Sequence, residues 1–263
     1  MQNKIILLAL VATASAFANA GDFYSVREST DELVKVNVTT GATTTVGSLG
    51  VNFNFGDLAF DTSSNTMYMS SGRDQGNGSS LYTVNLTTGA ATLVGAMGQV
   101  EMFGLAYDPT SGKLYGSQST GAQGFFDINK STGLASAIQT GQGVNLDGIT
   151  YVGSTKAITG IFAGPGSIYT VDPGSGNYTL VSNGGGFVDN CGVAWDASNN
   201  MMYSVDWSGA LYSFDVANSY NRTFIASMGQ SYDGLAYTGV VPEPTMMLAA
   251  AAGLAAMVRK RKK

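Results

Sequence analysis

A repeat of 43 to 48 residues is the feature that most limits what this chain can fold into. A short segment with apolar residues at its first and fourth positions occurs five times, and its fourth residue falls at Val36, Val84, Ile128, Val171 and Phe214. The spacings between these residues are 48, 44, 43 and 43. A period of this length, filled with short strand-like segments and glycine-containing turns, is typical of one four-stranded blade of a β-propeller.

A second element recurs in step with the first and marks the innermost strand of each blade. Its second copy, residues 104–108, reads Gly-Leu-Ala-Tyr-Asp, and the other copies occupy residues 57–61, 148–152, 192–196 and 234–238. Small and apolar residues suit this strand because neighbouring blades crowd around a central channel. The chain therefore contains five inner strands, one for each blade.

The order of the strands predicts how the ring closes. After residue 20 the chain begins at the second strand of a blade, residues 23–26, and its last repeat element is an inner strand, residues 234–238. We expect these two strands to pair in one composite blade, which removes two open sheet edges. The predicted fold is all-β, a five-bladed β-propeller closed by its N- and C-terminal strands; an open β-solenoid and two stacked sandwiches are the alternatives.

The N-terminal segment, residues 1–20, has the pattern of a signal peptide. Lys4 precedes the apolar run 5–11, and Ala18 and Ala20 place small residues where signal peptidase reads the chain. We expect cleavage after Ala20, which leaves residues 21–240 as the propeller. A membrane anchor is the alternative, but the apolar run is shorter than the roughly 20 residues that span a bilayer.

The C-terminal segment, residues 241–263, has three parts. Pro242, Glu243 and Pro244 are followed by an apolar run over residues 245–258 and then by five basic residues. This order predicts an extended linker, an apolar helix and a positive end that stays in the cytoplasm, so the propeller lies outside. The apolar run of 14 residues is short for a permanent span, which favours transient insertion into the inner membrane.

These three parts together resemble the PEP-CTERM sorting signal, which is also named after the C-terminal region of an ice-binding protein. The resemblance implies a Gram-negative host that makes exopolysaccharide. It also implies that a membrane-embedded exosortase recognises Pro242, Glu243 and Pro244, cleaves there, and releases the protein to the cell surface or extracellular matrix. A C-terminal anchor that is not processed is the alternative.

Composition excludes several function classes. The chain has no histidine and one cysteine, Cys191, so Ser-His-Asp and Cys-His catalysis are absent and no internal disulfide forms. Residues 21–240 carry 7 Lys and Arg against 17 Asp and Glu, a balance that disfavours nucleic acid as a partner. We expect Cys191 to be a small buried hydrophobe.

The longer loops, which enter the inner strands or join second to third strands, are expected to share one face of the propeller. A ligand would bind there, because variable loops that converge form concave sites. The candidate residues on this face are Arg73, Asp74, Glu101, Asp147, Asp189, Trp207, Tyr232 and Asp233.

Two kinds of chemistry are open to these residues. Asp147, Asp189 and Asp233 supply oxygen atoms of the kind that bind calcium, the one cofactor considered, although such carboxylates usually remain solvated or cap nearby backbone. Trp207 and Tyr232 present rings that suit stacking on a sugar, although a partly buried loop anchor is the commoner role for such residues.

The sequence indicates a non-enzymatic protein with no catalytic residues assigned. Its expected partners are signal peptidase, exosortase and exopolysaccharide, and the propeller serves as a structural or polysaccharide-binding component of the matrix. The alternative is a secreted glycosidase-like propeller, which needs two carboxylates at the channel mouth. Glu101 is the only glutamate that we expect on the loop face.

Overall fold

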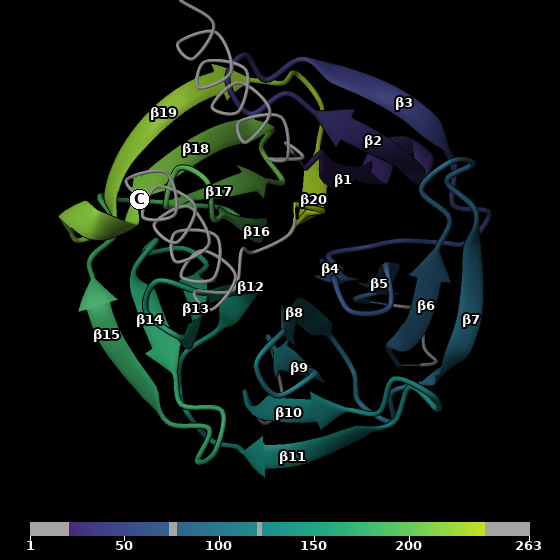
Figure 1. Ribbon diagram of the computed structural model, residues 1–263, viewed down its shortest axis with the longest axis horizontal. Coiled ribbons are helices and arrows are strands. Elements are labelled where there is room, and N and C mark those ends of the chain that lie inside the picture. The colour runs from purple at the N-terminus through teal and green to yellow at the C-terminus, as the bar shows by residue number, and fades with distance from the viewer. Residues whose placement is uncertain (1–20, 74–77, 120–122, 240–263) are drawn as a thin grey trace, which may run out of the picture.

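Five antiparallel sheets surround a central axis in the computed structural model, which describes residues 21–73, 78–119 and 123–239 (Figure 1). Each sheet has four strands, with the innermost strand at the axis and the outermost strand at the rim. The prediction of an all-β, five-bladed propeller is confirmed. In this part of the chain the helical elements are two short 3-10 turns, η2 (Glu28–Thr30) and η3 (Val216–Asn218).

The strands of each blade are given from the inside outwards. The composite blade contains β20 (Tyr232–Tyr237), β1 (Phe23–Arg27), β2 (Glu32–Val36) and β3 (Thr43–Ser48). The second blade contains β4 (Leu58–Asp61), β5 (Thr66–Ser70), β6 (Ser80–Val84) and β7 (Ala91–Ala96). The third blade contains β8 (Met102–Asp108), β9 (Lys113–Gln118), β10 (Phe125–Ile128) and β11 (Ala135–Gln139).

The last two blades repeat this arrangement. The fourth blade contains β12 (Leu146–Val152), β13 (Ala157–Phe162), β14 (Ile168–Val171) and β15 (Tyr178–Ser182). The fifth blade contains β16 (Cys191–Asp196), β17 (Met201–Asp206), β18 (Ala210–Asp215) and β19 (Asn221–Ser227).

The two ends of the described chain meet in the composite blade. β20 pairs antiparallel with β1, with Phe23 opposite Tyr237 and Ser25 opposite Leu235. The inner strand β20 also contacts the inner strands β16 and β4 of the two neighbouring blades. The expected pairing of residues 234–238 with residues 23–26 is therefore present, and the inner strands follow one another around the whole axis.

Short polar turns join the third strand to the outer strand in four of the blades. The side chains of Asn37, Asn85, Asn129 and Asp172 each follow the third strand of a blade and accept a backbone N–H two residues further on, at 2.7 to 2.9 Å. Asn and Asp favour such turns because their side chains bond to nearby backbone. The repeat therefore encodes its own hairpins.

The hydrophobic core is divided among the spaces between neighbouring blades. One cluster packs Tyr68 and Leu81 of the second blade against Leu105, Leu114 and Phe126 of the third. Cys191 is buried in another cluster, as expected for a small hydrophobe. Because each blade is covered by its neighbours, burial of apolar surface favours the closed ring.

Several sequence predictions fall outside the described residues. These are the signal peptide with Ala18 and Ala20, the loop residue Asp74, the motif Pro242-Glu243-Pro244 and the apolar helix after it. Along the part of the chain that is described, no helix has the length and apolar character needed to cross a membrane.

Candidate functional site

One buried aspartate occupies the axis of the propeller. Asp57 precedes the inner strand β4, and the equivalent positions in the other four blades are Gly104, Gly148, Gly192 and Gly234. A Cβ atom at Gly192 would lie 2.2 Å from the carbonyl carbon of Gly234. The inner strands approach so closely here that the glycines leave no room for further side chains.

The carboxylate of Asp57 links four blades through hydrogen bonds to their backbone. It accepts backbone N–H groups from Leu58 at 2.8 Å, Leu105 at 2.9 Å, Leu235 at 3.2 Å and Ile149 at 3.4 Å. These donors come from β4, β8, β20 and β12. Burial raises the pKa of Asp57, and the four N–H donors oppose that rise.

Two further acids, Asp147 and Asp233, lie one residue nearer the loop face, in β12 and β20. Both are buried, with 1% and 2% of their surface exposed. Asp147 Oδ2 accepts the backbone N–H of Cys191 at 3.1 Å, whereas its Oδ1 has no hydrogen-bond partner. Burial raises the pKa of Asp147 to about 8, with a smaller contribution from Asp189. Burial first and the charge of Asp147 second raise the pKa of Asp233.

An arginine and three aromatic rings cover the loop-side end of the channel. Arg73 Nε donates to Glu101 Oε1 at 2.8 Å. Its guanidinium carbon lies 5.2 Å from the ring centroid of Phe55 and 5.6 Å from that of Phe103. Trp207 is 44% exposed, and its ring centroid lies 6.0 Å from that of Phe55. We call these residues, together with the acids beneath them, the channel mouth.

Glu28 also belongs to the channel mouth, although the sequence analysis expected Glu101 to be the only glutamate there. Its Oε1 accepts the backbone N–H of Phe55, and its carboxylate hydrogen-bonds with Trp207. Burial is the largest cause of a raised pKa at Glu28. The prediction was wrong because Glu28 lies in η2, which joins a second strand to a third strand. Connections of this type are the ones expected on the loop face.

The structure brings most of the predicted ligand residues together. Arg73, Glu101 and Trp207 form the surface of the mouth, and Asp147 and Asp233 lie below it. Asp189 is half-buried at the entrance to β16, where its side chain accepts the N–H of Asn190 at 2.9 Å and acts electrostatically on Asp147.

Tyr232 does not contribute to the mouth, and its burial fits the role of an anchor rather than sugar stacking. Its side chain is 1% exposed, and its hydroxyl lies 3.4 Å from Arg27 Nε and 3.3 Å from Thr43 Oγ1. Successive side chains of a strand point to opposite faces. Tyr232 therefore points away from its neighbour Asp233 and packs in the core.

The candidate calcium residues Asp147, Asp189 and Asp233 interact through their charges without forming a metal site. Across residues 21–73, 78–119 and 123–239, no three acidic or cysteine side chains are placed to hold one metal ion. These residues therefore provide no set of ligands for the calcium ion that the sequence analysis considered.

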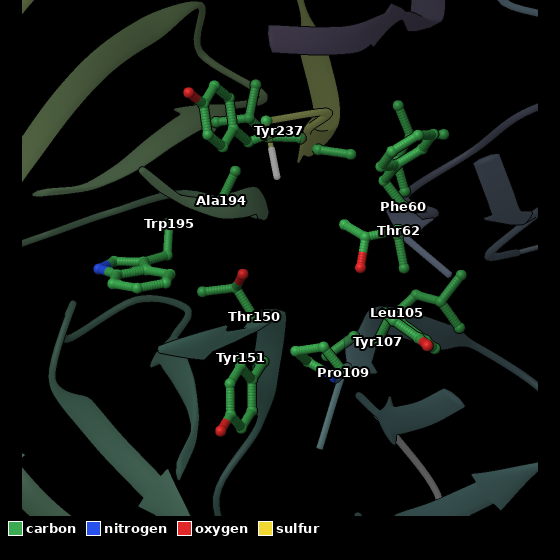
Figure 2. A pocket seen from close by; sticks show the side chains of 16 residues that line it. Phe60, Thr62, Leu105, Tyr107, Pro109, Thr150, Tyr151, Ala194, Trp195 and Tyr237 are labelled. Carbon is green, nitrogen blue, oxygen red and sulfur yellow. The ribbon is translucent and has the colours of Figure 1, made fainter. Parts of the chain in front are cut away.

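The opposite end of the channel is apolar and narrow (Figure 2). Its cavity volume is about 60 Å³, and its walls include Phe60, Tyr107, Tyr151, Trp195 and Tyr237. The polar ends of these rings are held by turn residues, as in the hydrogen bond of 3.0 Å from the Tyr107 hydroxyl to a serine of the β4–β5 turn. A cavity of this size holds a few water molecules. The charged side chains that a ligand could reach in the channel therefore lie at the loop-side mouth.

These features define a class: a five-bladed β-propeller with an axial carboxylate and an acidic, aromatic mouth. Residues 11–106 match the model of a family described as a domain of unknown function, DUF4394. This match covers 96 of the 263 residues, including β1 to β7 and most of β8. No curated protein sequence matches the chain.

Solved structures support the fold. A protein of unknown function from Bacteroides thetaiotaomicron aligns with a TM-score of 0.58 at 15% identity, over 84% of this chain and 63% of its own length. A chain of the nidogen/laminin complex aligns with a TM-score of 0.55 at 12% identity, over 84% of this chain and 99% of its own. TolB from Acinetobacter baumannii aligns with a TM-score of 0.53 at 13% identity, over 88% and 70%. This chain is thus shorter than the first of these proteins, and at such identities the likeness concerns the fold alone.

Proposed function

We propose that this protein is an exported, non-enzymatic propeller that binds polysaccharide at the cell surface or in the extracellular matrix. The observation that carries the proposal is the exposed ring of Trp207 beside Phe55 at the channel mouth. A flat aromatic surface that remains open to solvent, with polar groups around it, suits the apolar face and the hydroxyl groups of a sugar.

A non-enzymatic role is supported by how the two glutamates at the mouth are used. Glu101 pairs with Arg73, and Glu28 accepts the N–H of Phe55, so both carboxylates hold the aromatic residues in place. The raised pKa of Glu28 favours the glycosidase alternative, because the general acid of a glycosidase has a raised pKa. Hydrolysis of a polysaccharide that is abolished by Glu28→Gln would establish this alternative.

Trp207→Ala tests the binding role. We expect the protein to be retained on the exopolysaccharide of its host, and the variant to bind several-fold and up to about tenfold more weakly, because one stacked aromatic ring contributes about 0.5 to 1.5 kcal/mol. Affinity electrophoresis measures the difference. Phe224→Ala is the control, since that ring is 57% exposed on the outer strand β19, away from the mouth. If the unchanged protein is not retained, or if both variants weaken equally, the proposed site is wrong.

Export and sorting form the second part of the proposal. Signal peptidase removes residues 1–20, the C-terminal segment inserts transiently into the inner membrane, and exosortase cleaves at Pro242-Glu243-Pro244. The backbone N–H of Gly21, the first residue after the expected cut, donates to the Tyr237 hydroxyl at 3.2 Å. A mature chain that starts at Gly21 would therefore still be anchored to the last strand.

Mass spectrometry of the released protein tests this route. We expect a chain that begins at Gly21 and lacks the basic C-terminus when the host contains an exosortase. In a host without exosortase, the same chain should keep residues 245–263 and sediment with membranes. A released chain that retains its basic end in both hosts would contradict exosortase processing.

A further inference from the structure

The channel mouth contains a positively charged side chain of the protein itself, Arg73. The Arg73 guanidinium lies over the rings of Phe55 and Phe103 and pairs with Glu101. Two ring faces and a carboxylate form the kind of cage that binds positively charged groups. The Arg73 side chain is about half exposed, so its position can be reached from solvent.

The charges around this cage favour a positive ligand. Glu28, Glu101 and Asp189 lie at the mouth, where Arg73 supplies the positive charge that acts on Glu28. Asp147 and Asp233 lie below them, and burial raises the pKa of both, so these two carboxyl groups add less negative charge at neutral pH. A polysaccharide rich in carboxylate or sulfate groups would be repelled by this field.

Two buried carboxyl oxygen atoms in the mouth have no hydrogen-bond partner among the residues that the structure describes. They are Asp147 Oδ1, on a side chain that is 1% exposed, and Glu101 Oε2. An unpaired buried oxygen costs free energy unless a donor reaches it. Asp147 lies within the electrostatic influence of Arg73, so this unpaired oxygen belongs to the same site as the cage.

From these observations we infer that the mouth recognises a polymer of amino sugars with free ammonium groups. The inference rests on the proposed polysaccharide-binding function and gives its ligand class. A sugar ammonium takes the place of the Arg73 guanidinium over Phe55 and Phe103 and pairs with Glu101. Trp207 then covers an adjacent sugar ring. Lysine-rich peptides also carry ammonium groups, but they have no rigid ring for the open face of Trp207 to cover.

The test compares oligomers of glucosamine, N-acetylglucosamine and glucose by isothermal titration calorimetry on the full propeller. These sugars differ in the group at one carbon, and only glucosamine carries a positive charge. We expect glucosamine oligomers to bind about tenfold more tightly than the other two, which corresponds to about 1.4 kcal/mol and lies within the range of a partly desolvated cation–π contact. Added salt should reduce this preference.

Paired variants separate the cage from general charge effects. Glu101→Gln should weaken glucosamine binding about tenfold and weaken the binding of glucose oligomers less, because only the ammonium group pairs with this carboxylate. Arg73→Ala should strengthen glucosamine binding several-fold, because the internal cation no longer competes. Lys113→Ala is the control for Arg73→Ala, since it removes the same charge from an exposed pair with Asp127 in the third blade, and we expect no change.

The outcomes distinguish this inference from the proposed function. Equal, Trp207-dependent binding of all three oligomers would overturn the amino-sugar inference and leave polysaccharide binding standing. An absence of binding to every oligomer and to the host exopolysaccharide would overturn both. Oligolysine that binds as tightly as glucosamine oligomers would show a site for basic peptides, and weaker binding by Arg73→Ala would show that Arg73 contacts the ligand; either result overturns the inference.

Discussion

The ionisation of Asp147 couples the stability of the propeller to pH. Its pKa of about 8 lies above the ordinary value of 3.8, because burial disfavours the charged form. Between pH 4 and pH 8 the folded chain therefore holds a proton that the unfolded chain releases. The free energy of unfolding falls as pH rises through this window and levels off above it. The raised pKa of Asp233 acts in the same direction.

Asp147→Asn tests this dependence. We expect urea unfolding to show a steep loss of stability between pH 5 and pH 8 in the unchanged protein. The variant should show a slope smaller by about 1.4 kcal/mol per pH unit, the value for one proton. Asp172→Asn is the control, because its carboxylate caps an exposed turn and has a lowered pKa caused by backbone N–H donors. Parallel curves for all three proteins would contradict the role of Asp147.

At the scale of strands and turns, the repeat predicted the elements well and their side-chain directions less well. The third and outer strands lie where the alternating segments placed them, because local turn chemistry at residues such as Asn85 and Asn129 sets the hairpin between them. Tyr232 was placed in a loop of the ligand face, whereas its strand begins two residues before the repeated element. Glu28 was missed because its short connection has no sequence signal of its own.

Asp57 acts at the scale of the whole molecule, because its hydrogen bonds join strands from four blades. Asp57→Ala would leave four buried N–H groups without an acceptor. We expect it to lower the free energy of unfolding by about 3 kcal/mol or more, since each unpaired buried group costs about 1 to 3 kcal/mol and water recovers part of that loss. Urea unfolding measures the change.

Asp57→Asn provides a sharper comparison at the same position. The amide keeps the size of the carboxylate but turns one acceptor oxygen into a donor that faces N–H groups, so we expect it to destabilise the fold almost as much as alanine. Stability within about 1 kcal/mol of the unchanged protein for both variants would show that the axial carboxylate is dispensable.

The sequence by itself determined the number of blades, their strand order and the pairing of the two chain ends. Those properties follow from a period and from local turns, which are readable along the chain. Only the tertiary structure decided that Asp57 lies on the axis, that Glu28 joins Glu101 at the mouth, and that Arg73 covers Phe55 and Phe103. These contacts join residues from different blades, and their geometry depends on how closely the inner strands approach one another. No local pattern encodes that distance.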